Sequence, residues 1–409
     1  MKIRLKTRLG KFFRYSIVIG IIGIAVCSEA KTESDVEKKP QLDLKILEQQ
    51  ASQGQADAQY KLFQYFFNQE DKTKAIEFLQ QAVKQGHAQA LNDLGWLYYK
   101  GIGVPQNNQK AVQLLNQSKD KNYAGAYGNL ATLYSRGDGV SKDLKKAFEL
   151  SKYAADHGIG ASAYNTAIAY AQGTGVAKNE AKSLEYLKKA SELELAEAQH
   201  QYAWVLIRGE GTQKNIQEGI KWLNKAAEQN HTLSLTQLGG LYTEDNDLVK
   251  ANPDLAFKYT RQAVEQGNID ALSNLCWLFS EGIGTKKDTE IALKCMQKAS
   301  ELGQSQATIN LGLQYFSGKL VKADYQKAVE LFNLAMKQGN DSAKPLLANA
   351  YYQGKGVKKD EEKANELFIQ AFEAGSGIDP KTATEYKLCR LESRMVQGNV
   401  MHAVECPIF

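Results

Sequence analysis

The sequence predicts an all-α protein, a right-handed α-solenoid of about nine helix-turn-helix repeats of 36 residues each. The period is marked by recurring glycines: Gly101, Gly137, Gly173, Gly209, Gly282, Gly318 and Gly354. Two further repeats fit between Gly209 and Gly282. Around each glycine, leucine, alanine and tyrosine recur at helical spacings. A fixed period of this length is typical of stacked helical hairpins, which bury their apolar faces against their neighbours.

We count positions from this turn glycine, so that position −7 lies seven residues before it. Position −7 is leucine in five repeats, position −6 is alanine or glycine in six, and position −3 is tyrosine or phenylalanine in six. These positions share one face of a helix. A second helix with alanine at +10 and +17 follows each turn. The small residues predict close approach between helices.

Several turns read Gly-x-Gly before a lysine-rich amphipathic stretch, as in residues 137–150, which resembles the start of a phosphate-binding loop. Such a loop needs a preceding β-strand, and none is predicted in any repeat. Glycine adopts positive φ without steric cost, which suits a tight turn between two helices. We therefore interpret the glycines as structural.

The first 30 residues have the pattern of an export signal. Six basic residues precede an apolar run from Tyr15 to Cys27, which is shorter than the roughly 20 residues of a membrane-spanning helix. Cleavage before Lys31 predicts a periplasmic or secreted protein. The alternatives are a lipoprotein, with lipidation at Cys27, and an uncleaved N-terminal membrane anchor.

The rest of the chain divides into four segments. We predict a disordered tether over residues 31–40, an N-terminal capping helix over 41–54, the solenoid over 55–375, and a C-terminal capping helix and tail over 376–409. The pattern is irregular in the first repeat, which is four residues short, and in the sixth, whose turn lacks glycine.

Charge and motif content argue against several function classes. Without the leader, basic and acidic residues are equal in number, so we expect no nucleic-acid partner. The five histidines have no metal-ligand spacing, and the single Ser-x-x-Lys match at Ser118 lacks the motifs that accompany it in penicillin-binding enzymes. We expect no catalytic residue, no metal site and no cofactor.

Three segments, residues 90–118, 271–303 and 343–375, resemble the Sel-one-like repeat (SLR) family, a relative of the tetratricopeptide repeat. The resemblance covers about residues 55–375. It implies a non-catalytic scaffold or adaptor that binds a protein partner, in bacteria often at the cell envelope. A cysteine-rich branch of the family implies the alternative, penicillin binding or β-lactam hydrolysis. That branch has a cysteine pair in nearly every repeat, whereas here only the seventh repeat has one.

The first helices of a helical-hairpin solenoid line its concave side, where a partner peptide or helix would bind. Positions −9, −5 and −2 form one stripe on these helices, turned away from the core positions. The predicted partner-binding residues are Asn92, Trp96, Tyr99, Tyr164, His200, Trp204, Trp277, Phe316 and Tyr352. Three tryptophans share position −5. The alternative is that these aromatic side chains pack against the next repeat. A membrane is expected as a partner only if the chain is lipidated or keeps its signal.

The seventh repeat holds Cys276 at position −6 and Cys295 at position +13. Both positions face the inside of the same helical hairpin, at a separation that a disulfide can span. The alternative is two buried free thiols.

Overall fold

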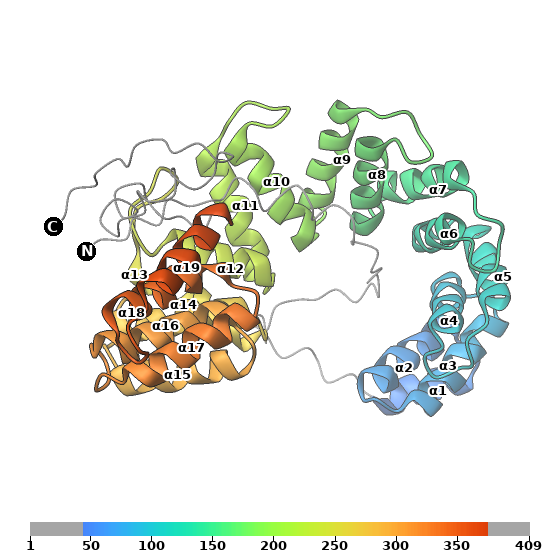
Figure 1. The fold of residues 1–409 in the computed structure, drawn as a ribbon. Coiled ribbons are helices and arrows are strands. Elements are labelled where there is room, and N and C mark those ends of the chain that lie inside the picture. Colours follow the sequence, from blue (N-terminus) through green and yellow to red (C-terminus); the bar gives the residue numbers. More distant parts are fainter. Residues whose placement is uncertain (1–43, 375–409) are drawn as a thin grey trace. The chain divides into compact units, whose positions relative to one another are not determined.

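The computed structural model describes residues 44–374, which form nineteen α-helices and no β-strand (Figure 1). The prediction of an all-α solenoid is confirmed. The helices divide into two compact units, with the boundary between Gln229 and Asn230. The predicted export signal, the tether, Cys27 and the C-terminal cap lie outside the described residues.

Unit 1 starts with the single helix α1 (Leu44–Ser52), whose Leu47 and Ala51 pack against Leu62. Five helical hairpins follow. Their first helices are α2 (Ala56–Asn68), α4 (Ala88–Lys100), α6 (Ala124–Arg136), α8 (Gly160–Gln172) and α10 (Ala196–Arg208). Their second helices are α3 (Lys72–Lys84), α5 (Asn108–Lys119), α7 (Leu144–Asp156), α9 (Glu180–Glu192) and α11 (Ile216–Glu228).

Unit 2 contains four helical hairpins. Their first helices are α12 (Thr232–Leu241), α14 (Ile269–Glu281), α16 (Ser305–Ser317) and α18 (Lys344–Gln353). Their second helices are α13 (Pro253–Glu265), α15 (Thr289–Glu301), α17 (Tyr325–Lys337) and α19 (Glu361–Glu373). A short 3-10 helix, η2 (Asp341–Ala343), precedes α18.

The core of each hairpin follows the repeated positions. The leucines at position −7, such as Leu94 and Leu130, are buried between the two helices. Position −6 must be small because the helices approach closely there: a Cβ atom on Gly95 would lie 2.9 Å from Cγ of Leu115, and one on Gly312 would lie 2.6 Å from Cε1 of Phe332. The sequence-based interpretation of these positions is confirmed.

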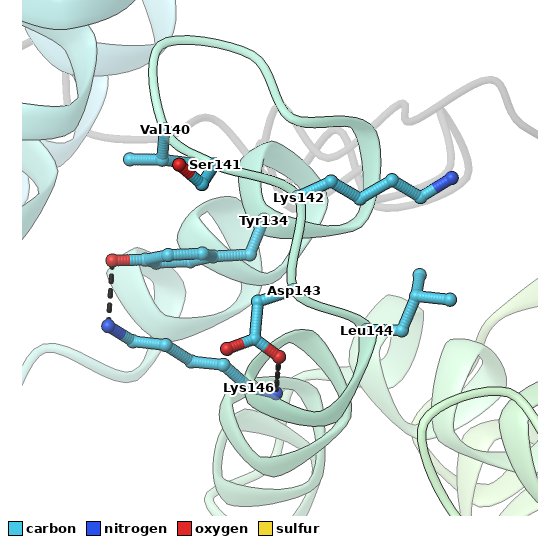
Figure 2. A pocket seen from close by; sticks show the side chains of 7 residues that line it. All are labelled: Tyr134, Val140, Ser141, Lys142, Asp143, Leu144 and Lys146. Carbon is cyan, nitrogen blue, oxygen red and sulfur yellow. Dashed lines mark hydrogen bonds between the residues drawn. The ribbon is translucent and has the colours of Figure 1, made fainter.

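Each turn is closed by the residue that caps the second helix. In the third hairpin the Asp143 N–H donates to the Tyr134 carbonyl at 2.9 Å, and the Asp143 carboxylate accepts from the Lys146 N–H at 2.9 Å. The Lys146 ammonium donates to the Tyr134 hydroxyl at 2.8 Å and lies 4.2 Å from the ring centroid (Figure 2). Backbone bonds of the same kind occur at six other regular turns: Asn107–Tyr98, Asn179–Tyr170, Asn215–Leu206, Asp288–Phe279, Asp324–Tyr315 and Asp360–Tyr351. The cap thus fixes the second helix to the end of the first.

The two glycines of a turn have different roles. The first, for example Gly173 with φ +74°, ends the first helix in the left-handed conformation. The second, Gly175 with φ +72°, lies against the preceding repeat, where a Cβ atom would overlap the carbonyl oxygen of Leu144 in α7. Gly284 meets Pro253 in the same way. At these turns the second glycine therefore allows one repeat's backbone to pack directly on its neighbour.

The two irregular repeats keep the hairpin by other means. The short turn after α2 has no glycine, and Glu70 adopts φ +61° there. In the sixth repeat the connection from Tyr242 to Asn252 is longer, yet the Asn252 N–H still donates to the Tyr242 carbonyl at 2.8 Å. The sixth repeat therefore shares the cap with the regular repeats, although it lacks their turn glycine.

We predict that Gly175→Ala destabilises unit 1 far more than Gly211→Ala. Both glycines have positive φ, so each alanine should cost about 1–2 kcal/mol from its backbone conformation. Only Gly175 meets backbone atoms, because the nearest atom to a Cβ on Gly211 is Cδ2 of Leu184 at 3.9 Å. Thermal unfolding followed by circular dichroism measures the difference, and hydrogen exchange locates it at α7. Equal losses would show that the close contact between repeats is unimportant.

Candidate partner-binding surface

The nine predicted partner-binding residues all lie on first helices, but the structure separates them by exposure. Four of them are buried, so they do not line an open groove: Asn92, Trp96, Tyr99 and His200. Four others are half-buried: Tyr164, Trp204, Phe316 and Tyr352. Only Trp277 is exposed, with 41% of its surface accessible. The prediction that these residues share one exposed stripe is therefore wrong for the four buried members.

Trp96 and Trp277 occupy the same repeat position in very different surroundings. Trp96 is 7% exposed, its ring lies 5.2 Å from that of Tyr99, and the Lys100 ammonium lies 4.8 Å from its centroid. In the seventh repeat the position of Tyr99 is taken by Ser280, three residues after Trp277. Its hydroxyl donates to the Trp277 carbonyl at 2.8 Å. A serine cannot cover the indole, so Trp277 remains exposed.

Asn92 is buried because position −9 faces the next first helix. The Asn129 amide of α6 donates to the Asn92 Oδ1 at 2.9 Å, and the Asn92 amide donates to the Asp93 Oδ1 at 3.0 Å. The Tyr60 hydroxyl of α2 donates to the other Asp93 oxygen at 2.7 Å. Burial raises the pKa of both the Asp93 carboxyl and the Tyr60 hydroxyl. This network joins three successive first helices and is structural.

A contact between position −9 of one repeat and position −8 of the next also occurs further along unit 1. The Gln201 side-chain amide of α10 donates to the Tyr164 hydroxyl of α8 and, at 2.8 Å, to Glu197. Burial raises the pKa of the Tyr164 hydroxyl. His200, next to Gln201, is 4% exposed. Position −9 therefore contacts position −8 of the following repeat instead of facing a partner.

Tyr99, at position −2, is also held by the following repeat. Its hydroxyl donates to Asp138 Oδ2 at 3.0 Å and accepts from the Arg136 guanidinium at 3.1 Å. Burial raises the pKa of the Tyr99 hydroxyl. Asp138 is the residue directly after the turn glycine Gly137, so this part of a turn reaches back to the preceding first helix.

The first helices α14, α16 and α18 contribute large apolar side chains to the accessible surface of unit 2. Trp277 is exposed, while Leu313, Phe316 and Tyr352 are half-buried. The Lys355 ammonium lies 5.6 Å from the Phe316 ring centroid. In unit 1 the half-buried Trp204 has the Arg208 guanidinium 5.3 Å from its ring. Aromatic rings with a cation at one face combine apolar area with positive charge.

The seventh repeat contains the disulfide that its cysteine positions allowed. Cys276 of α14 and Cys295 of α15 are joined, with their Cα atoms 5.4 Å apart. Cys276 is fully buried at position −6, where most repeats have alanine or glycine. The bond therefore ties the helix that carries Trp277 to its partner in the hairpin. Cys389 and Cys406 lie outside the described residues.

A shallow pocket in the turn of the third hairpin has a structural explanation (Figure 2). It is lined by Tyr134, Val140, Ser141, Lys142, Asp143, Leu144 and Lys146. Its Asp143 caps α7 and its Lys146 bonds to Tyr134, so neither group is directed at a substrate. Between residues 44 and 374 no cluster of three or more His, Cys, Asp or Glu residues is arranged to hold a metal ion. None of the described helices is long and apolar enough to cross a membrane.

Three further residues lie near Trp277 and Phe316, and sequence reasoning did not identify the two lysines among them. Asn274 is exposed one turn before Trp277 on α14. The Lys319 ammonium lies 3.3 Å from Glu281 at the end of α14, and Lys355 lies over Phe316. Lysine directly after the turn glycine in two consecutive repeats was the available sequence signal.

The sequence profile of the Sel1 repeat family matches nine consecutive segments: residues 56–87, 88–123, 124–159, 160–195, 196–231, 232–268, 269–304, 305–340 and 346–376. Among solved structures, a protective antigen of uropathogenic Escherichia coli strains with an SLR fold is 21% identical, with a TM-score of 0.53 over 89% of this chain and 100% of its own. A Sel1 repeat protein from Oxalobacter formigenes is 26% identical, with a TM-score of 0.51 over 73% of this chain and 86% of its own. No curated protein matches the chain.

We predict stability losses of very different size for two tryptophan truncations at the same repeat position. Trp96→Ala removes a buried ring and should lower the free energy of unfolding by about 3–5 kcal/mol. Trp277→Ala removes an exposed ring and should cost about 1 kcal/mol or less. Urea unfolding followed by circular dichroism measures both. Similar losses for the two variants would contradict the difference in burial.

Proposed function

The chain belongs to the Sel1 repeat family, and on that basis we propose that it is a non-catalytic scaffold that binds a partner peptide or helix on the accessible side of its first helices. Sel1 repeat proteins are generally protein-interaction scaffolds. A scaffold needs a rigid framework and accessible anchor residues, and it needs no catalytic group.

The exposure of Trp277 is the observation that carries this proposal. A tryptophan is the largest apolar side chain, and large aromatic residues at the surface are typical anchors of protein interfaces. The other side of α14 is fixed by the buried Leu275 and by the disulfide at Cys276. Trp277 is thus presented on a helix whose position is well defined, which reduces the entropy lost when a partner binds.

The alternative, an enzyme of the cysteine-rich SLR type that binds or hydrolyses penicillin, has less support. Its main sequence feature is the cysteine pair of the seventh repeat. Both sulfur atoms are joined in the disulfide, so neither provides a thiolate nucleophile. The disulfide has a sufficient structural role, because it links the two helices of one hairpin.

We also propose that the protein acts outside the cytoplasm, in the periplasm or after secretion. Two features support this location. The first is the basic and then apolar N-terminus, and the second is the disulfide, because disulfides persist in oxidising compartments. Lipidation at Cys27 is the alternative that would place the same scaffold on a membrane surface.

Site-specific photo-crosslinking in the source cells tests the scaffold proposal. A photo-crosslinking amino acid at the exposed position Asn274, beside Trp277, should capture a discrete partner. The same amino acid in place of the exposed Lys294 of the second helix α15 is the matched control and should capture none. The crosslink at position 274 should be lost when Trp277→Ala is added, because the anchor is then absent.

Crosslinks from position 294 alone would place the partner on the second helices and contradict the proposal. The enzymatic alternative is tested with the purified full-length mature protein and the chromogenic β-lactam nitrocefin. We expect no turnover above that of buffer. Turnover above that of buffer would favour the enzyme instead.

A further inference from the structure

The turns of unit 2 are unusually rich in lysine. The turns after α14, α16 and α18, residues 282–288, 318–324 and 354–360, contain seven: Lys286, Lys287, Lys319, Lys322, Lys355, Lys358 and Lys359. All except Lys355 are exposed. The four corresponding turns of unit 1, which end at residues 107, 143, 179 and 215, contain one lysine each or none. The positive charge is therefore a property of these three hairpins and is not shared by all repeats.

The acidic residues in these turns are already engaged. Asp288, Asp324 and Asp360 are the caps of the second helices, and each accepts a backbone N–H at 2.9–3.0 Å. Their carboxylates also face the positive end of the helix dipole. Lys319 pairs with Glu281 and Lys359 with Glu361. Within residues 44–374 the other exposed lysines of these turns form no ion pair: Lys286, Lys287, Lys322 and Lys358.

Two of the lysines connect the turns to the aromatic side chains. Glu281, the partner of Lys319, lies one helical turn after Trp277 on α14. Lys355 lies over Phe316, which follows Leu313 by three residues on α16. In both cases the residue directly after the turn glycine contacts the first helix of the preceding repeat. Lys319 and Lys355 therefore bring positive charge close to Trp277 and Phe316 at the C-terminal ends of the first helices.

In the third hairpin, in unit 1, the same position has the opposite charge and is occupied. There Asp138 directly follows the turn glycine and accepts a hydrogen bond from the buried Tyr99. No such carboxylate covers Phe316, where the cation Lys355 stands instead. The residue directly after the turn glycine is lysine in two hairpins of unit 2 and in no hairpin of unit 1, which indicates different binding properties.

Asn274 adds a group suited to a peptide main chain. It is exposed on α14, three residues before Trp277, and makes no hydrogen bond to any described residue. A side-chain amide presents one acceptor and a donor side by side, as a peptide unit does. It can therefore bind the main chain of an extended segment that passes over Trp277.

We propose that Asn274, Trp277, Phe316 and the turn lysines of α14, α16 and α18 form a lysine-aromatic surface that binds an extended protein segment carrying acidic residues beside a large apolar one. This inference rests on the proposed scaffold function and specifies its partner. The lysines attract the carboxylates and the indole contacts the apolar side chain, because complementary charge steers association while apolar contact retains the partner.

Binding of defined peptide pools to the full-length mature protein, followed by fluorescence anisotropy, tests this surface. The peptides have about 12 residues, enough at about 3.3 Å per residue to cross three helices that are about 10 Å apart. The acidic pool draws on Asp, Glu, Leu, Phe, Ser and Gly. The basic pool has Lys and Arg in place of Asp and Glu, and the neutral pool has Asn and Gln.

We expect the acidic pool to bind most tightly and its affinity to fall at least ~10-fold between about 50 and 500 mM NaCl, because salt screens the lysines. Lys319→Glu with Lys355→Glu should weaken binding by a similar factor, as should Trp277→Ala. Lys286→Glu with Lys287→Glu, at two exposed and unpaired positions, repeats the test without affecting packing. The matched control, Lys294→Glu with Lys298→Glu on α15, makes the same change in charge and should bind as the unmodified chain does.

Several outcomes would overturn the proposal. If the basic or neutral pool binds better and Trp277→Ala abolishes that binding, the scaffold function stands but the acidic partner is wrong. Failure of all three pools overturns the lysine-aromatic surface, while the crosslink from position 274 decides the scaffold function separately. Lysine-dependent binding of phosphatidylglycerol vesicles or single-stranded DNA without acidic peptide binding would identify another anionic ligand. Binding of the acidic pool only after deletion of residues 376–409 would mean that the chain's own C-terminal segment occupies the surface.

Discussion

In four turns the close backbone contact at the second turn glycine is the constraint on which the stacking of neighbouring repeats depends. Gly175 and Gly284 each place a turn against the carbonyl oxygen at the start of the preceding second helix, where no Cβ atom fits. Within each hairpin the small residue at position −6 allows a similar approach between the two helices. The cap residue then orients the second helix by its bond to the carbonyl at position −3. These three features set the distance between neighbouring helices within a unit, and the side chains on the first helices must accommodate it.

That distance explains why the first helices of unit 1 offer little accessible surface. When neighbouring first helices are this close, position −9 meets position −8 of the next repeat, as in the Asn92–Asn129 pair, and position −2 meets the next turn, as in Tyr99–Asp138. These polar contacts satisfy groups that would be costly to bury alone. The surface available to a partner is what remains after such contacts form. In unit 2 it includes Trp277, because Ser280 replaces the tyrosine that covers Trp96.

The repeat period was sufficient to predict the helices, the turns and the core. Side-chain size is constrained at positions −7, −6 and −3, because a residue that is too small there leaves a cavity in the hairpin and one that is too large causes a clash. It also placed Cys276 and Cys295 inside one hairpin, where the structure has a disulfide. The period could not predict exposure at position −5, because that depends on the neighbouring side chain at −2: tyrosine after Trp96, isoleucine after Trp204 and serine after Trp277. Nor could it predict the Tyr60–Asp93 bond, which needs the register between two helices. Comparing the residues at −2 and −1 among repeats would have provided part of this information.

The central claim is that residues at one repeat position are buried in one hairpin and accessible in another. Acrylamide quenching of single-tryptophan variants tests it most directly, with the other three of the four tryptophans replaced by phenylalanine. The account predicts that Trp277 emits at longer wavelength and is quenched several-fold more strongly than Trp96, with Trp204 between them. Equal quenching of Trp96 and Trp277 in folded variants would contradict the account, because the two residues would then have the same exposure.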